Sequence, residues 1–228
     1  MNQESYIDDP FRTGKAYTVG EAARLALTSP QNVRRWMVGY NAPGHKMEPV
    51  FGNKHSPGDL LTISFLELAE IVIVAGFRKQ RVPLQRTRDA HEYARRTFGL
   101  AYPFASLNLR ESGGHILHEF EQQQPGPGKL VSLDMQGQYV LPETVQLTVV
   151  NFDFSDTDRL ASRWFPFGRH VPVVVDPHFG AGAPTVIGSR VTVDTLKRRW
   201  KAGETIKSMS SDLELEEEDV EHVLQRAA

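Results

Sequence analysis

Apolar residues in the first hundred positions recur at three- and four-residue spacing, the period of a helix with one buried face. The first helix is predicted over about 19–27, and its buried side comprises Val19, Ala22, Ala23 and Ala26. Thr18 and Glu21 match a capping box, in which each side chain bonds a free backbone N–H at the helix start.

A second short helix is predicted to begin at the Ser29-Pro30 step. Serine is a favourable N-cap, and proline fits the first helical position because its missing N–H has no partner there anyway. Val33, Trp36 and Met37 fall on one face of this helix. The opposite face carries Gln31, Arg34 and Arg35. Two short helices around a turn, with a polar outer edge, predict a helix-turn-helix.

The pattern changes twice between residues 41 and 98. Residues 41–58 are rich in proline and glycine, a turn-and-wing composition. Ser64 and Glu67 form a second capping box, and the helix over 65–77 is apolar nearly all round, which predicts burial. A further helix over 83–98 is predicted to expose a basic face made of Arg86, Arg88, Arg95 and Arg96.

The pattern after residue 110 is typical of short strands. The runs GHIL, KLVSL, QYVL and VQLTVVNF predict a small antiparallel sheet over 113–154. Three short helices are predicted over 193–202, 206–213 and 216–227. The expected fold class is therefore α+β and mainly helical: a winged helix-turn-helix over 12–110, a small β-rich middle region over 111–170, and a helical domain over 171–228.

Composition and charge limit the kinds of site and partner that the protein can have. The chain has 228 residues and no cysteine, which excludes disulfides and thiolate zinc sites. It shows no secretory leader, and the apolar run over 71–77 is far shorter than the roughly 20 residues of a membrane span, so we expect a cytoplasmic protein with no membrane partner. Residues 1–110 carry 15 Lys and Arg against 10 Asp and Glu, whereas residues 111–228 carry 11 against 18. A basic front and an acidic back suggest two different partners.

The second helix has the residue types that read DNA. Glutamine pairs with adenine and arginine with guanine in the major groove, and a helix N-terminus can hold a phosphate. The alternative is a surface hairpin whose arginines are only solvated, and the basic face over 83–98 has the same two interpretations. The candidate DNA-binding residues are Thr28, Ser29, Gln31, Asn32, Arg34 and Arg35.

Residues 17–40, YTVGEAARLALTSPQNVRRWMVGY, resemble the helix-turn-helix of MerR-type regulators. That family usually has a glycine and an aliphatic residue before the Ser-Pro step, where this chain has Leu27 and Thr28. Residues 173–227 resemble a helix-turn-helix-like domain of unknown function, through VVVDPHFGAGAPTVIGSRVTV, LKRRWKAG, ETIKSM and LEEEDVEHVL. The order of these parts over nearly the whole chain looks like that of VapB-type antitoxins.

The VapB resemblance implies a PIN-like ribonuclease toxin as partner, neutralisation by complex formation, and repression of the shared operon. A PIN-type site is a cluster of carboxylates, so an inhibitor is expected to offer cations to it. The alternative for these residues is a solvated helix with Trp200 in the core. The candidate toxin-binding residues are Arg190, Lys197, Arg198, Arg199 and Trp200. The acidic run 214–221 should avoid nucleic acid, which favours protein contact for this domain.

No catalytic arrangement, metal site or cofactor site is predicted, and we expect a non-enzymatic protein. His115 and His118 would lie on opposite faces of a strand and so could not share a metal. A homodimer is expected because two recognition helices about 34 Å apart meet successive major grooves. Two alternatives stay open: a stand-alone MerR-like regulator that senses a ligand through its middle domain, and a protein-binding module with no DNA role.

Overall fold

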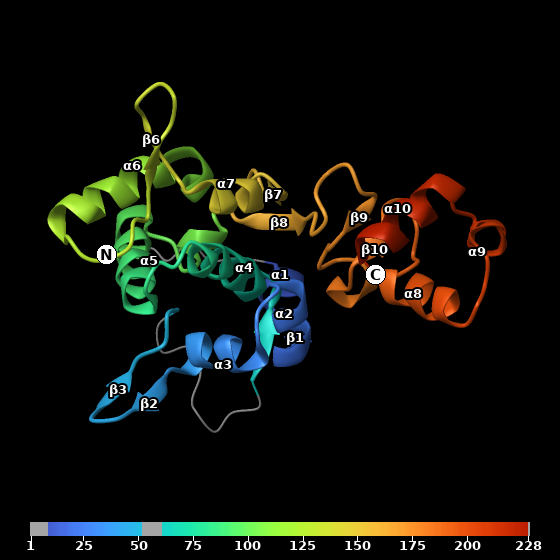
Figure 1. Ribbon diagram of the computed structural model, residues 1–228, viewed down its shortest axis with the longest axis horizontal. Helices are drawn as coiled ribbons and strands as arrows, with labels where there is room; N and C mark the ends of the chain where they lie inside the picture. The colour runs from blue at the N-terminus through green and yellow to red at the C-terminus, as the bar shows by residue number, and fades with distance from the viewer. Residues whose placement is uncertain (1–8, 52–60, 228) are drawn as a thin grey trace. The chain divides into compact units, whose positions relative to one another are not determined.

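The computed structural model describes residues 9–51 and 61–227, and the chain divides into two compact units (Figure 1). Unit 1 takes the residues up to Val150 together with Phe154–Ala161, and unit 2 takes Asn151–Asp153 and the chain from Ser162 onward. The fold is a mixture of helices and two-stranded sheets, as predicted. None of the helices in the described ranges has an apolar stretch that could cross a membrane.

Unit 1 contains two paired strands that each run directly into a capped helix. Strand β1 pairs antiparallel with β4, with Thr18 opposite Thr62. Both predicted capping boxes are present: Thr18 with Glu21 at the start of α2, and Ser64 with Glu67 at the start of α4. The first elements are α1 (Pro10–Thr13), β1 (Lys15–Thr18), α2 (Val19–Leu25), α3 (Pro30–Val38), β2 (Tyr40–Ala42), β3 (His45–Met47) and β4 (Thr62–Ser64).

Helix α4 (Phe65–Lys79) is the centre of unit 1. Every residue from Phe65 to Phe77 is buried, as expected for a helix that is apolar all round. Its contacts include α1, α5 (Leu84–Phe98), the short 3-10 helix η1 (Pro103–Ala105) and α7 (Glu143–Val149), and Figure 1 shows it in the middle of the unit. Gly76 lies directly against Val145 of α7, where a Cβ would already touch the valine.

The predicted sheet over 113–154 is wrong for most of its length. GHIL lies within α6 (Leu107–Gln123), a helix capped by Ser106, and most of VQLTVVNF forms α7. Buried residues at helical spacing explain the difference, because each short apolar run was one turn of a longer amphipathic pattern. Within this range the strands are a small hairpin, formed by β5 (Ser132–Leu133) and β6 (Tyr139–Val140), and a short strand at residues 152–154. The buried positions of α6 are Leu109, Gly113, Gly114, Leu117 and Phe120.

Strands β7 (Phe152–Phe154) and β8 (Ala161–Trp164) pair where the chain passes between the units. Unit 2 continues with β9 (Val173–Val174), the 3-10 turn η2 (Gly180–Gly182) and β10 (Thr185–Val186), which pairs antiparallel with β9. Three helices follow: α8 (Val193–Lys201), α9 (Ile206–Leu213) and α10 (Glu217–Ala227).

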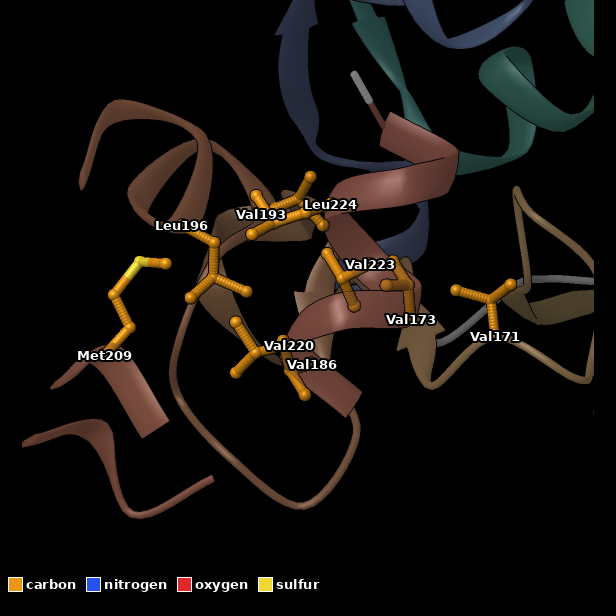
Figure 2. Close-up of a cluster of buried hydrophobic side chains, with 9 residues drawn as sticks. All are labelled: Val171, Val173, Val186, Val193, Leu196, Met209, Val220, Val223 and Leu224. Carbon is orange, nitrogen blue, oxygen red and sulfur yellow. The ribbon is translucent and has the colours of Figure 1, made fainter. Parts of the chain in front are cut away.

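The core of unit 2 is built by its sheet and its three helices. Strands β9 and β10 contribute Val173 and Val186, and α9 contributes Met209 (Figure 2). Helix α10 packs against both α8 and α9. Because its buried residues are one turn apart, its acidic residues lie on the solvated side. The buried residues of α8 and α10 in this core are Val193, Leu196, Val220, Val223 and Leu224.

Candidate functional site

The turn between α2 and α3 is a Schellman motif with a leucine at its left-handed position. The Thr28 N–H donates to the Ala23 carbonyl at 2.9 Å, and the Leu27 N–H donates to the Arg24 carbonyl at 3.2 Å. Leu27 has φ +51° and its side chain is 75% exposed. Glycine is usual at such a position because it has no Cβ, so Leu27 strains the turn without burying apolar surface in return.

Three of the candidate DNA-binding residues build the start of α3. The Ser29 Oγ accepts from the Asn32 N–H at 3.1 Å, which is the predicted N-cap. The Asn32 side-chain amide donates to the Thr28 Oγ at 3.1 Å. Ser29 is exposed, while Thr28 and Asn32 are half-buried. These side chains therefore fix the turn and leave the exposed first turn of α3 facing solvent.

The other three candidates lie along the outer edge of α3. Gln31 and Arg34 are exposed, and Arg35 is half-buried. The Arg35 guanidinium lies over the ring of Tyr40, 4.9 Å from its centre, which is cation–π geometry. The opposite face of the helix is buried, as predicted, and consists of Val33, Trp36 and Met37. The helix is thus fixed from below and presents hydrogen-bonding side chains outward.

A two-stranded hairpin follows α3 directly. Strands β2 and β3 pair from Tyr40 opposite Met47 to Ala42 opposite His45. Gly39 makes the bend into the hairpin at φ +74°, and a Cβ there would lie 2.3 Å from the Met47 carbonyl oxygen. The chain leaving the hairpin is tied back to the helix, because the Val50 N–H donates to the Trp36 carbonyl at 2.8 Å.

Arg88 of α5 ties the same segment to the core of unit 1. Its Nε donates to the Pro49 carbonyl at 3.0 Å, and its Nη2 donates to the Glu48 carbonyl. Burial lowers the pKa of Arg88. Arg88 thus fixes the end of the hairpin relative to α3.

The predicted exposed basic face over 83–98 is wrong for two of its four arginines. Arg86 is only 7% exposed: it donates to the Gln124 carbonyl and lies 4.5 Å from the ring centre of Phe120. Arg88 is half-buried against the hairpin. Long arginine stems can cover apolar surface, which the spacing of charges alone does not reveal. Arg95 and Arg96 stay near the surface and bind Glu92, and the Arg95 hydrogen bond is the main cause that lowers the pKa of Glu92 to about 2.

The five candidate toxin-binding residues differ in how firmly unit 2 holds them. Arg199 bonds both Glu204 oxygens and Asp212, each at 2.6 Å, and these bonds raise its pKa. Arg198 pairs with Asp194 at 3.1 Å, and both side chains are 72% exposed. Such a surface pair contributes about 0–1 kcal/mol and can exchange partners readily. Arg190 is exposed and Lys197 half-buried.

Trp200 is not in the core, contrary to the alternative interpretation. It continues the stripe of Val193 and Leu196 along α8, yet 49% of it is exposed because the helix ends one residue later. A half-exposed tryptophan beside basic residues has the composition of an interface hot spot.

The structure contains two buried clusters of ionisable side chains that no sequence pattern predicts. Arg12 is 5% exposed and bonds Asp9 at 2.7 Å and Asp158 at 2.5 Å, which lies 146 residues away in the same unit. Glu70 of α4 lies 2.9 Å from His91 of α5, and both side chains are buried. Polar contacts between distant positions leave no periodicity in the sequence, so only the fold brings these residues together.

The structure places His115 and His118 on helix α6 rather than on a strand. His115 pairs with Glu119 at 3.2 Å, and His118 stacks on Tyr139. Over residues 9–51 and 61–227, no group of three or more His, Asp or Glu residues is arranged to hold a metal ion.

Two family models match the chain. Residues 15–91 match the family described as "Putative DNA-binding HTH domain", which includes α2, α3 and the β2–β3 hairpin. Residues 173–225 match a family of unknown function, DUF433, which includes β9 to α10. The chain therefore carries a helix-turn-helix domain at its N-terminal side.

Three proteins of Mycobacterium tuberculosis are similar to this chain over most of its length. "Putative antitoxin VapB45" is 28% identical and the match covers 86% of this chain and 87% of that protein. "Uncharacterized protein Rv2308" is 26% identical, over 87% and 84%. The crystal structure of Rv2018 matches with a TM-score of 0.76 and 27% identity, over 93% of this chain and 99% of that one. One of these three similar proteins is thus named as a putative antitoxin.

Proposed function

We propose that this protein is the antitoxin of a type II toxin–antitoxin system. It represses its own operon through unit 1 and neutralises a PIN-like ribonuclease toxin through unit 2, acting by binding and not by catalysis. The observation that carries the proposal is the outward edge of α3, where Gln31 and Arg34 are exposed on a helix that lies in the matched helix-turn-helix region. The similarity to a protein named as an antitoxin supports the toxin partner.

In this proposal α3 enters the major groove and the β2–β3 hairpin acts as its wing. Gln31, Arg34 and Arg35 reach base edges, because long side chains near the start of a recognition helix make those contacts. Thr28, Ser29 and Asn32 contact phosphate at the helix N-terminus. A homodimer doubles this modest basic surface and places two recognition helices about one turn of DNA apart.

For the toxin, the proposed contact is the end of α8. Trp200 supplies apolar area, and Lys197, Arg198 and Arg190 offer cations to the carboxylates of a nuclease site. Arg199 has a different role, because Glu204 and Asp212 already bind it. It ties α8 to both ends of α9, through Glu204 just before that helix and Asp212 near its end.

The proposal is tested by co-expressing the full chain with the product of the neighbouring gene and purifying on one tag. We expect a PIN-like protein to co-purify and to lose ribonuclease activity in the complex. The combined Trp200→Ala and Arg198→Glu substitutions should weaken the complex at least about tenfold, the effect of losing one hot spot. Lys207→Glu, on the exposed side of α9, is the matched control. An undiminished complex for the double variant would move the interface elsewhere.

Operator binding is tested separately with fluorescently labelled DNA from the region upstream of the gene, at two salt concentrations. We expect tighter binding to this DNA than to a scrambled duplex, with affinity falling as salt rises. Equal weak binding to both duplexes would contradict operator recognition. If the protein forms the toxin complex but does not prefer the operator DNA, it is a protein-binding module without a DNA role.

A further inference from the structure

Unit 1 contains a cavity of about 590 Å³ between helix α6, strand β6 and helix α7, outside α3 and its hairpin. Its volume falls within the range of about 300–1,000 Å³ that is typical of small-molecule sites. We propose that this cavity binds a small organic anion with a flat apolar body, such as an aryl carboxylate or an aryl phosphate. The proposal does not depend on the DNA or toxin partners.

A glycine holds one wall of the cavity in place. At Gly114 of α6 a Cβ would lie 2.1 Å from the Tyr139 carbonyl oxygen, so only glycine lets β6 lie this close to the helix. Gly113, next to it, lies against the side chains of Leu109 and Leu141. The wall between α6 and β6 is therefore formed by close backbone packing, and the site exists before a ligand arrives.

The cavity is lined in part by apolar side chains that are partly exposed. Tyr139 and Val150, both lining residues, are each 42% exposed. The Tyr139 ring is held by stacking on His118, with 3.4 Å between ring centres and 10° between planes. A ring fixed on one face offers a rigid surface to a flat ligand, and burying it against that ligand is favourable.

The charge at the rim selects an anion. The Arg110 side chain lines the cavity and makes no hydrogen bond or ion pair with any residue among 9–51 and 61–227. The neighbouring carboxylate of Glu111 is already paired with Arg159, and His115 is paired with Glu119. Arg110 is thus the rim cation whose planar fork of donors matches a carboxylate or a phosphate.

The test uses the full chain and the fluorescent probe 8-anilinonaphthalene-1-sulfonate, which has an aryl body and one negative charge. We expect a saturable fluorescence rise with one site per chain. Arg110→Gln should weaken this binding about tenfold by removing the charged partner. Gln138→Glu, which adds a negative charge at the rim, should weaken it as well. The matched control is Arg96→Gln on α5, which should bind the probe like wild type.

The neutral probe N-phenyl-1-naphthylamine separates charge from apolar contact, and neither Arg110→Gln nor Gln138→Glu should change its binding. Equal binding of the charged probe by wild type and both variants, with unchanged melting temperatures, would overturn the proposal. So would an unsaturable rise. Competition with benzoate and with phenyl phosphate identifies the anion: displacement by either supports the site, and displacement by neither contradicts it.

Discussion

The guanidinium carbon of Arg35 lies 4.9 Å from the centre of the Tyr40 ring. This contact joins the outer edge of α3 to the first residue of the hairpin that follows it. A side chain held in this way loses less conformational freedom when it binds a base, which strengthens binding. Under the proposed function, Tyr40 therefore acts on DNA recognition by holding Arg35 in place.

Separate substitutions of Arg35 and Tyr40 should distinguish base contact by Arg35 from the positioning of Arg35 by Tyr40. We expect Arg35→Ala to weaken operator binding by about 1–3 kcal/mol, as for the loss of one base contact. Tyr40→Leu should weaken it by about 0.5–1 kcal/mol, the value of an exposed cation–π contact. Fluorescence anisotropy on operator and scrambled DNA measures both, with Arg96→Ala as control. If Arg35→Ala lowers affinity for the two duplexes equally, Arg35 contacts phosphate and does not read a base.

Substitution of Arg88 tests whether this arginine of α5 holds the hairpin in place or binds a DNA phosphate. Arg88→Met keeps most of the stem but removes the bonds to Glu48 and Pro49, so the hairpin loses an anchor. We expect unfolding in urea to become easier by about 1–3 kcal/mol, the effect of a lost charged hydrogen bond. Binding to DNA should weaken while its dependence on salt keeps the same slope, because no phosphate contact is lost. A slope reduced by about one unit would show that Arg88 binds phosphate instead.

The sequence predicted the parts of this fold that depend on neighbouring residues. Both capping boxes, the Ser29 cap and the buried underside of α3 follow from contacts within four positions, and the structure has them all. The outward direction of Gln31 and Arg34 follows from the same helical period. Such features are readable because short-range geometry decides them.

Long-range features were not readable in the same way. The short apolar run GHIL predicts a strand, but it lies in α6, where Gly114 lets β6 approach the helix closely. Arg86 was expected on a solvated face, but Phe120 and the Gln124 carbonyl, 34 and 38 residues further on, take it into the interior. The cavity beside β6 has the same origin, since its walls come from three separate segments.

Leu27 is predicted to be an unfavourable residue in its turn. Its left-handed backbone costs about 1–2 kcal/mol for a residue with a Cβ, and its exposed side chain has little apolar burial to lose. Glycine removes this cost but gives the unfolded chain more conformational freedom, which offsets about 0.5–1 kcal/mol of the gain. We therefore expect Leu27→Gly to stabilise unit 1 by about 0.5–1 kcal/mol. Urea unfolding followed by circular dichroism measures the change. Ala26→Gly, one residue earlier with negative φ and a buried side chain, should destabilise by about 1 kcal/mol. A loss of stability in both variants would contradict the strain at Leu27.

Asp158 should make unit 1 sensitive to acid. Burial by itself would raise the pKa of Asp158, but the hydrogen bond and charge of Arg12, together with hydrogen bonds from the Leu160 N–H and Ser155, outweigh burial, and the pKa is lowered overall. A carboxyl whose pKa is lower in the folded state stabilises the fold above its unfolded pKa of about 3.9. That contribution is lost as the pH falls through the lower, folded value. Because the pair is buried, Asp158→Asn should lower the free energy of unfolding by about 2–3 kcal/mol at pH 7.

The difference between wild type and Asp158→Asn should then shrink as the pH is lowered from 5 towards 2, since both proteins carry a neutral side chain at the acid end. Thermal unfolding across this series measures it. Asp156→Asn is the matched control, because Asp156 is exposed and only two positions away; its stability should follow that of wild type at every pH. A constant gap between wild type and Asp158→Asn would mean that the ion pair with Arg12 does not supply the stabilisation, and that packing around Asp158 does.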